Sequence, residues 1–158
     1  MLDLLAGIEG TAFSTWTRES PSIWAYPTIL TLHTVGFGIV VGLCVVMDLR
    51  LLDKGRRIPL SALLGFFPLI GAAFALNAAT GIALFMSAAT TKGVQPVFYL
   101  KLALIGLALW DTAFARRLIR EGADRGEGVG RRRARIIATT SLVLWTAAIT
   151  AGRLMAYL

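Results

Sequence analysis

The chain has 158 residues, of which 56% are hydrophobic and 16% are charged. This composition is too apolar for an ordinary soluble domain of this length, and it predicts a membrane protein. The net charge of +7 would also suit a nucleic-acid-binding protein, but the basic residues lie in two blocks between apolar stretches, as in cytoplasmic loops. We therefore expect contact with anionic membrane lipid and no nucleic-acid partner.

Residues 1–19 are too short and too polar to span a bilayer. Apolar residues recur at roughly helical spacing from Leu2 to Trp16, which predicts an amphipathic helix at the membrane surface. A Ser-Pro-Ser sequence at 20–22 ends this helix, and Trp24 suits the aromatic belt of the membrane interface. No cleavable signal-peptide pattern is present, so the first apolar helix is expected to stay in the membrane.

Residues 20–158 are expected to form one domain of four transmembrane helices, because four apolar stretches each approach the ~20 residues that cross the hydrocarbon core. They cover about residues 27–52, 60–88, 96–118 and 136–158. The second contains Pro68 and many small residues, which let neighbouring helices approach closely or leave room for a flat cofactor. The predicted fold is an all-α integral membrane four-helix bundle with an N-terminal amphipathic interfacial helix.

Basic residues are unevenly distributed around these helices. Arg50, Lys54, Arg56 and Arg57 follow the first helix, and Arg116, Arg117, Arg120, Arg125, Arg131, Arg132, Arg133 and Arg135 surround the loop after the third. The opposite side has Arg18 and Lys92. The positive-inside rule therefore places both basic loops in the cytoplasm and both termini outside. We expect a multi-pass protein of the bacterial inner membrane with both termini in the periplasm.

The chain's only histidine, His33, lies inside the first apolar helix. An ionisable residue within a transmembrane segment is costly and normally faces the bundle interior. Neutral imidazole is the commonest metal ligand among side chains and also ligates haem iron. It also forms simple hydrogen bonds between helices. Taken alone, His33 leaves metal ligation and interhelical hydrogen bonding equally open.

Each of the other three helices has one polar residue at a similar depth, counted at about 1.5 Å per residue. They are Asn77, Lys101 and Arg153. If all face inward with His33, the pocket contains an imidazole, an amide and two cations but no carboxylate, so it should accept an anion. Haem supplies two propionates and an iron, and Gly36, one turn from His33, offers space beside a porphyrin. The alternatives are snorkelling for Arg153 and interhelical hydrogen bonding for Asn77.

Two acidic residues lie deeper in the predicted bundle. Asp48 is most simply paired with Arg50 or another basic residue at the cytoplasmic rim, whereas Asp111 is balanced between a structural role and a proton relay. Cys44 is interpreted as a small buried hydrophobic residue. We find no nucleophile elbow, phosphate-binding loop, paired-histidine motif or cysteine cluster. The sequence therefore assigns neither an enzymatic activity nor catalytic residues.

Two short motifs give a family resemblance. Leu32-His33, opening a helix that closes on the Asp-Leu-Arg-Leu-Leu sequence at 48–52, resembles the first helix of the small bacterial membrane protoporphyrinogen oxidases, which bind haem b. The run 98–105, which contains Lys101, is similar to their third helix. Copper-resistance D membrane proteins, and small four-helix bacterial membrane proteins of uncharacterised function, are similar in the same way.

In the oxidase family the first-helix histidine ligates haem and the third-helix lysine is functional, which implies these roles for His33 and Lys101. This chain departs from the family pattern in two places. Trp110-Asp111 stands where the family has a later histidine, and residues 1–19 are an added segment. Both departures affect the prediction of oxidase activity more than the prediction of haem binding.

The leading hypothesis is a membrane protein that binds one haem b per subunit near the outer leaflet and acts in redox chemistry, electron transfer or sensing. His33 is the axial ligand, Lys101 a second ligand or propionate partner, Arg153 a charge partner, and Asn77 an orienting group beside them. Quinone or a partner membrane protein would exchange electrons with the haem. The alternative is a transporter or structural membrane protein without haem that handles copper or a small anion. We expect a homo-oligomer.

Overall fold

The computed structural model describes residues 2–52, 59–125, 129–155 and 157. The described residues form helices joined by turns, with no strand among them, so the all-α prediction is confirmed. The helices are, in chain order, α1 (Leu2–Glu9), α2 (Ala12–Glu19), α3 (Tyr26–Leu51), α4 (Leu60–Leu64), α5 (Phe66–Met86), α6 (Ala89–Lys92), α7 (Pro96–Arg125) and α8 (Arg131–Leu154).

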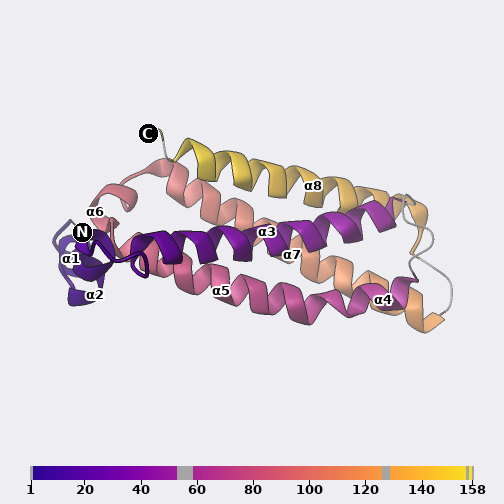
Figure 1. Ribbon diagram of the computed structural model, residues 1–158. Helices are drawn as coiled ribbons and strands as arrows, with labels where there is room; N and C mark the ends of the chain where they lie inside the picture. The colour runs from indigo at the N-terminus through magenta and orange to yellow at the C-terminus, as the bar shows by residue number, and fades with distance from the viewer. Residues whose placement is uncertain (1, 53–58, 126–128, 156, 158) are drawn as a thin grey trace.

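Four long helices run side by side as a bundle (Figure 1). α3 packs against α5 and α8, α8 packs against α7, and the short α4 contacts α7. One end of the bundle, called here the N-terminal end, holds α1, α2, α6 and the C-terminus; α4 and the basic segments mark the other, basic end (Figure 1). The core between the helices includes Val40, Met47, Ile70 and Trp145.

The outer surface of the bundle is apolar, and its four long helices are long enough to cross a membrane. The spans are Tyr26–Leu51, Leu60–Met86, Pro96–Asp124 and Arg131–Leu154, between 24 and 29 residues long. Large hydrophobic side chains are exposed on every one of them, for example Val35, Ile82, Leu107 and Val143. Exposing so extensive an apolar surface to water is unfavourable, whereas contact between this surface and lipid tails is not. The chain is a multi-pass membrane protein.

The second span is not one continuous helix, because it changes from α4 to α5 at Gly65. Pro68 explains the position of the break. A proline lacks a backbone N–H and its ring clashes with the carbonyl of the residue four positions earlier. That residue is Leu64, the last of α4.

At the basic end, two helix boundaries also differ from those expected, at 118 and 136. α7 continues to Arg125, and α8 begins at Arg131. The expected boundaries follow the apolar residues alone. The helices continue past these boundaries because the residues there include Arg, Ala and Glu, which also form helix well in water. The two helices therefore extend into the aqueous phase at the basic end. Lys54, Arg56 and Arg57 lie outside the described residues.

The N-terminal segment forms two helices rather than the single helix expected over 1–19. Thr11 caps α2, where its hydroxyl accepts a hydrogen bond from the Ser14 amide at 3.4 Å, so the chain turns between α1 and α2. α2 buries Ser14 and Thr17 against the protein and exposes Phe13 and Trp16. Exposed aromatic rings suit the membrane interface, and the interfacial placement of this segment stays a prediction.

Glu9 attaches this segment to the bundle. Its carboxylate accepts hydrogen bonds from the Thr90 amide at 2.8 Å and the Thr90 hydroxyl at 2.5 Å. Arg18 donates to Glu9 and to the Ser87 carbonyl, both at 3.3 Å. The Thr90 hydroxyl, followed by its amide, holds the pKa of Glu9 below its ordinary value.

We expect acid to release this attachment. A carboxyl with a lowered pKa stabilises the folded state above its unfolded pKa, which is about 4.3 for glutamate. This stabilisation is lost as the pH falls below that value and through the lower, folded pKa. Amide hydrogen exchange, corrected for intrinsic rates, should show α1 losing protection relative to α8 over this range. Glu9→Gln should lose that protection already at neutral pH, whereas Glu121→Gln, at an exposed glutamate of α7, should behave as wild type. Equal protection in wild type and Glu9→Gln at neutral pH would contradict the assignment.

Candidate functional site

His33 on α3 faces α5 in the half of the bundle near the N-terminal end. Its ring Nδ1 lies 3.0 Å from the Asn77 carbonyl oxygen and 3.2 Å from the Thr80 hydroxyl. The side-chain amide of Asn77 donates to the His33 carbonyl at 2.8 Å. Asn77 and Thr80 are buried, so these bonds join α3 and α5 in the interior.

These contacts favour one position of the imidazole proton. The backbone carbonyl of Asn77 can only accept and lies nearer to Nδ1, at 3.0 Å, than the side-chain amide nitrogen of Asn77, at 3.2 Å, which can only donate. We therefore assign the proton to Nδ1. The Thr80 hydroxyl donates to the Leu76 carbonyl at 2.7 Å and accepts from Nδ1. The other ring nitrogen, Nε2, keeps its lone pair, and no described residue hydrogen-bonds to it. Metal-ligating histidines are held in this way, through the N–H of the non-ligating nitrogen.

Two glycines allow this close approach. A Cβ on Gly36 would lie 3.1 Å from the backbone carbonyl oxygen of Ala73 and 3.3 Å from the backbone nitrogen of Asn77. A Cβ on Gly81 would lie 3.1 Å from Cε1 of His33. The space beside Gly36 that was expected for a porphyrin is thus filled by α5. In the structure Gly36 brings α5 to the imidazole.

Lys101 on α7 lies in the same half of the bundle and is partly buried beside α8. A Cβ on Gly152 would lie 3.5 Å from its Cε and 3.7 Å from its Nζ, so the glycine makes room for the ammonium group. Lys101 is close enough to His33 to act on it electrostatically. Within the described part of the chain, both ion pairs belong to Arg18, and none involves Lys101.

Arg153, the fourth residue expected in the pocket, is exposed near the end of α8. It makes no hydrogen bond or ion pair with His33, Asn77 or Lys101 among the described residues. Its long side chain suits the snorkelling alternative, in which an arginine reaches toward headgroups. The structure therefore groups His33 with Asn77 and Lys101 and leaves Arg153 at the rim.

Three contributors were not among the expected site residues: Thr80, Gly81 and Gly152. Thr80 and Gly81 follow Asn77 by three and four positions, so helical spacing places them on its face. That spacing was the signal available in the sequence. Gly152 had no such signal, because its contact with Lys101 depends on how α7 and α8 align.

The variant Asn77→Leu tests whether the side-chain amide of Asn77 stabilises the bundle. The variant loses the amide donated to the His33 carbonyl but keeps the backbone carbonyl that accepts from Nδ1. We expect a loss of about 0.6 kcal/mol, the average for such a bond in a membrane bundle, and no more than roughly 1.7 kcal/mol. Unfolding in mixed micelles measures it, with Thr34→Ala as control because Thr34 is exposed and bonds to its own helix. A variant as stable as wild type would show that the amide contributes nothing.

The described residues contain no group of three or more histidine, cysteine, aspartate or glutamate side chains that could hold a metal ion. His33 would suit a centre that needs one ligand from the chain, because the porphyrin of a haem would supply the other nitrogen ligands of the iron.

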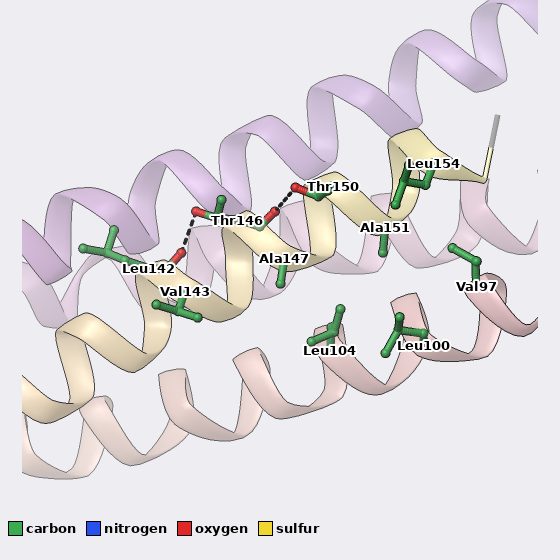
Figure 2. A pocket seen from close by; sticks show the side chains of 10 residues that line it. All are labelled: Val97, Leu100, Leu104, Leu142, Val143, Thr146, Ala147, Thr150, Ala151 and Leu154. Carbon is green, nitrogen blue, oxygen red and sulfur yellow. Dashed lines mark hydrogen bonds between the residues drawn. The ribbon is translucent and has the colours of Figure 1, made fainter. Parts of the chain in front are cut away.

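An apolar groove of about 600 Å³ lies between α7 and α8 (Figure 2). Val97, Leu100 and Leu104 line it from α7, opposite Thr146 and Thr150 of α8. The two threonine hydroxyls donate to carbonyls of their own helix, at 2.7 and 2.9 Å (Figure 2). No polar hydrogen remains for a ligand in the groove, so lipid acyl chains suit it.

Comparisons of the chain with protein-family models, with curated proteins and with solved structures gave no match. The resemblance to the haem-b oxidases and the copper-resistance D proteins therefore stays a prediction from two motifs.

Proposed function

We propose that this membrane protein binds haem b, one per subunit, through His33 as axial ligand. One observation carries the proposal: the Asn77 carbonyl holds Nδ1–H of His33 at 3.0 Å and leaves Nε2 without a partner among the described residues. Haem iron binds a neutral imidazole nitrogen. Burial between α3 and α5 fixes the ring so that little freedom is lost on binding.

Lys101 supports the same proposal through charge. Its ammonium group shares a region with the imidazole and is not ion-paired to a described carboxylate. A haem propionate would supply the missing negative charge, or the lysine nitrogen would serve as a second ligand. Arg153 adds positive charge at the rim, and Asn77 holds the imidazole.

When bound, the haem supplies an iron for electron transfer or for binding a small ligand. The chain's own part is to orient the imidazole, to balance the propionate charge and to exclude water with the surrounding apolar side chains. With Lys101 as second ligand, the site suits electron exchange with quinone or a partner membrane protein. With Lys101 on a propionate, an open position on the iron suits redox chemistry or sensing.

The proposed location is the bacterial inner membrane, with both termini in the periplasm. Its support is the uneven distribution of charge between the two ends of the bundle. Arg116, Arg117, Arg120 and the arginines from 131 to 135 lie at the basic end, whereas Arg18 and Lys92 lie at the N-terminal end. Positively charged residues flank the cytoplasmic ends of membrane helices.

The decisive experiment is expression with haem supplied, purification in mild detergent and an absorption spectrum. We expect a Soret band and about one haem per chain in a haemochrome assay. Native mass measurement of the same sample gives the oligomeric state. One haem per two chains would contradict the one-per-subunit proposal and place His33 of two subunits on a shared iron. A colourless protein would overturn haem binding altogether.

A further inference from the structure

A second cluster of polar side chains lies toward the basic end of the bundle; its members on α3, Cys44 and Asp48, are about 16 and 22 Å along the helix from His33 at about 1.5 Å per residue. We call it the acid cluster. Its members are Cys44 and Asp48 on α3, Asp111 and Thr112 on α7, and Ser141 and Trp145 on α8. It shares no residue with the proposed haem site.

The cluster is buried and its members act on one another. Asp48 is 2% exposed, and Ser141 and Asp111 both act on its carboxyl group. The Cys44 sulfur lies 3.7 Å from the Thr112 hydroxyl, which donates to the Ala108 carbonyl at 2.8 Å. Three helices thus meet around two carboxyl groups.

Three polar atoms of the cluster are buried without a hydrogen-bond partner in the described part of the chain. They are Oδ2 of Asp48, Oδ2 of Asp111 and the indole nitrogen of Trp145, a residue only 1% exposed. Trp145 approaches the Cys44 thiol, one turn from Asp48, and its ring packs at 67° to that of Phe37. An indole N–H needs an acceptor, and the two acid oxygens need hydrogens. A bound proton, carried on an acid or by a water, would supply what the oxygens lack.

Neither acid is ion-paired with a described residue, because the two ion pairs between described residues are those of Arg18, at the other end of the bundle. Arg116, the next basic residue along α7, lies over the Phe67 ring at 5.5 Å. From α8 the cluster receives Ser141 and Trp145, which carry no charge, and from α3 the thiol of Cys44. Two ionised carboxylates buried away from water would repel each other, and no counter-charge would offset the cost of removing them from water.

We propose that Asp48 and Asp111 form a proton-binding site, in which Asp48 is held as the neutral acid and Asp111 exchanges the proton with the basic end. Asp48 is fully enclosed, whereas Asp111 is partly exposed. The exchange is a transfer of one proton: the O–H bond of Asp48 breaks, an O–H bond on Asp111 forms, and Asp111 then releases the proton. No electron is transferred, so the site operates with or without haem.

Infrared spectroscopy of the full chain in liposomes tests this inference directly, because a neutral carboxylic acid has a C=O stretch that a carboxylate lacks. At about pH 7, where an ordinary aspartate is ionised, the wild type should show this band, shifting in D₂O. Asp48→Asn should lose the band. Asp111→Asn should keep the band but change the pH at which it disappears, because a neighbouring negative charge has been removed.

Asp124→Asn is the matched control, because Asp124 is an exposed aspartate on the same helix as Asp111; it should leave the band unchanged. The thermal midpoint of Asp48→Asn should equal or exceed that of wild type, since an amide replaces a neutral acid of the same shape. Absence of the band in folded wild type would overturn the proposal. So would its persistence in Asp48→Asn, its removal by sodium ions at constant pH, or a clearly lower midpoint for that variant, which would reveal an ionised, paired Asp48.

Discussion

The variant His33→Ala is expected to lose the Soret band of the haem-supplied protein. Removing a group that only orients a metal ligand costs roughly 10- to 100-fold in affinity, and removing the ligand itself should cost more. Haem content per chain should therefore fall by more than about tenfold in the haemochrome assay. The fold should persist, because the imidazole contributes one interhelical hydrogen-bond group worth only about 0.6 kcal/mol.

Two further variants make this result specific. Thr34→Ala changes the next residue, which is exposed and bonds to the Leu30 carbonyl of its own helix, and it should keep the wild-type spectrum. His33→Gly, with imidazole added to the buffer, should regain part of the band, because free imidazole enters the space left by the side chain. If His33→Ala kept the wild-type band, His33 would be an interhelical hydrogen-bonding residue and the haem ligand would lie elsewhere.

The variant Gly36→Leu is expected to destabilise the bundle and to displace the proposed site together. A Cβ at this position would lie within 3.1–3.3 Å of backbone atoms of Ala73 and Asn77. Backbone atoms, unlike side-chain ends, cannot rotate away, so α5 must move. Overpacking of this kind costs about 1–3 kcal/mol. A displaced α5 also carries the Asn77 carbonyl away from Nδ1 of His33, so haem content should fall as well.

Gly38→Leu provides the matched control for this prediction. Gly38 lies two residues along α3, is exposed, and has nothing within 4 Å of the position of a Cβ. A leucine there would meet lipid and should change neither the thermal midpoint nor the haem content. Equal stability of the Gly36 and Gly38 variants would show that α3 and α5 do not approach at Gly36 as the structure has them.

Much of the fold follows from properties that a sequence expresses locally. A stretch of apolar residues long enough to cross the hydrocarbon core predicts a span whatever its neighbours are. All four expected spans are therefore present. Pro68 lies inside the second span, and its ring explains the break after Leu64. The helix ends at 118 and 136 were wrong because hydropathy marks the edge of the membrane and not the end of a helix.

For the site residues, the sequence predicted only their depth along each helix. Counting residues placed His33, Asn77, Lys101 and Arg153 in the same half of the bundle, since rise per residue is a property of each helix alone. Which of them meet depends on the rotation of each helix about its axis. Contacts with neighbouring helices set that rotation. The structure brings Asn77 to His33 with a hydrogen bond and leaves Arg153 exposed.

The sequence by itself determined that this is an all-α membrane protein and that its histidine lies inside the membrane, because hydropathy, helical rise and proline chemistry act along the chain. Tertiary structure alone decided that Gly36 brings α5 against α3, that Nδ1 of His33 is bound while Nε2 has no partner among the described residues, and that two acids act on one another without an ion pair to a described cation. These are properties of contacts between helices. Small residues and buried polar groups set such contacts through sterics and hydrogen bonds, and neither is visible in one helix at a time.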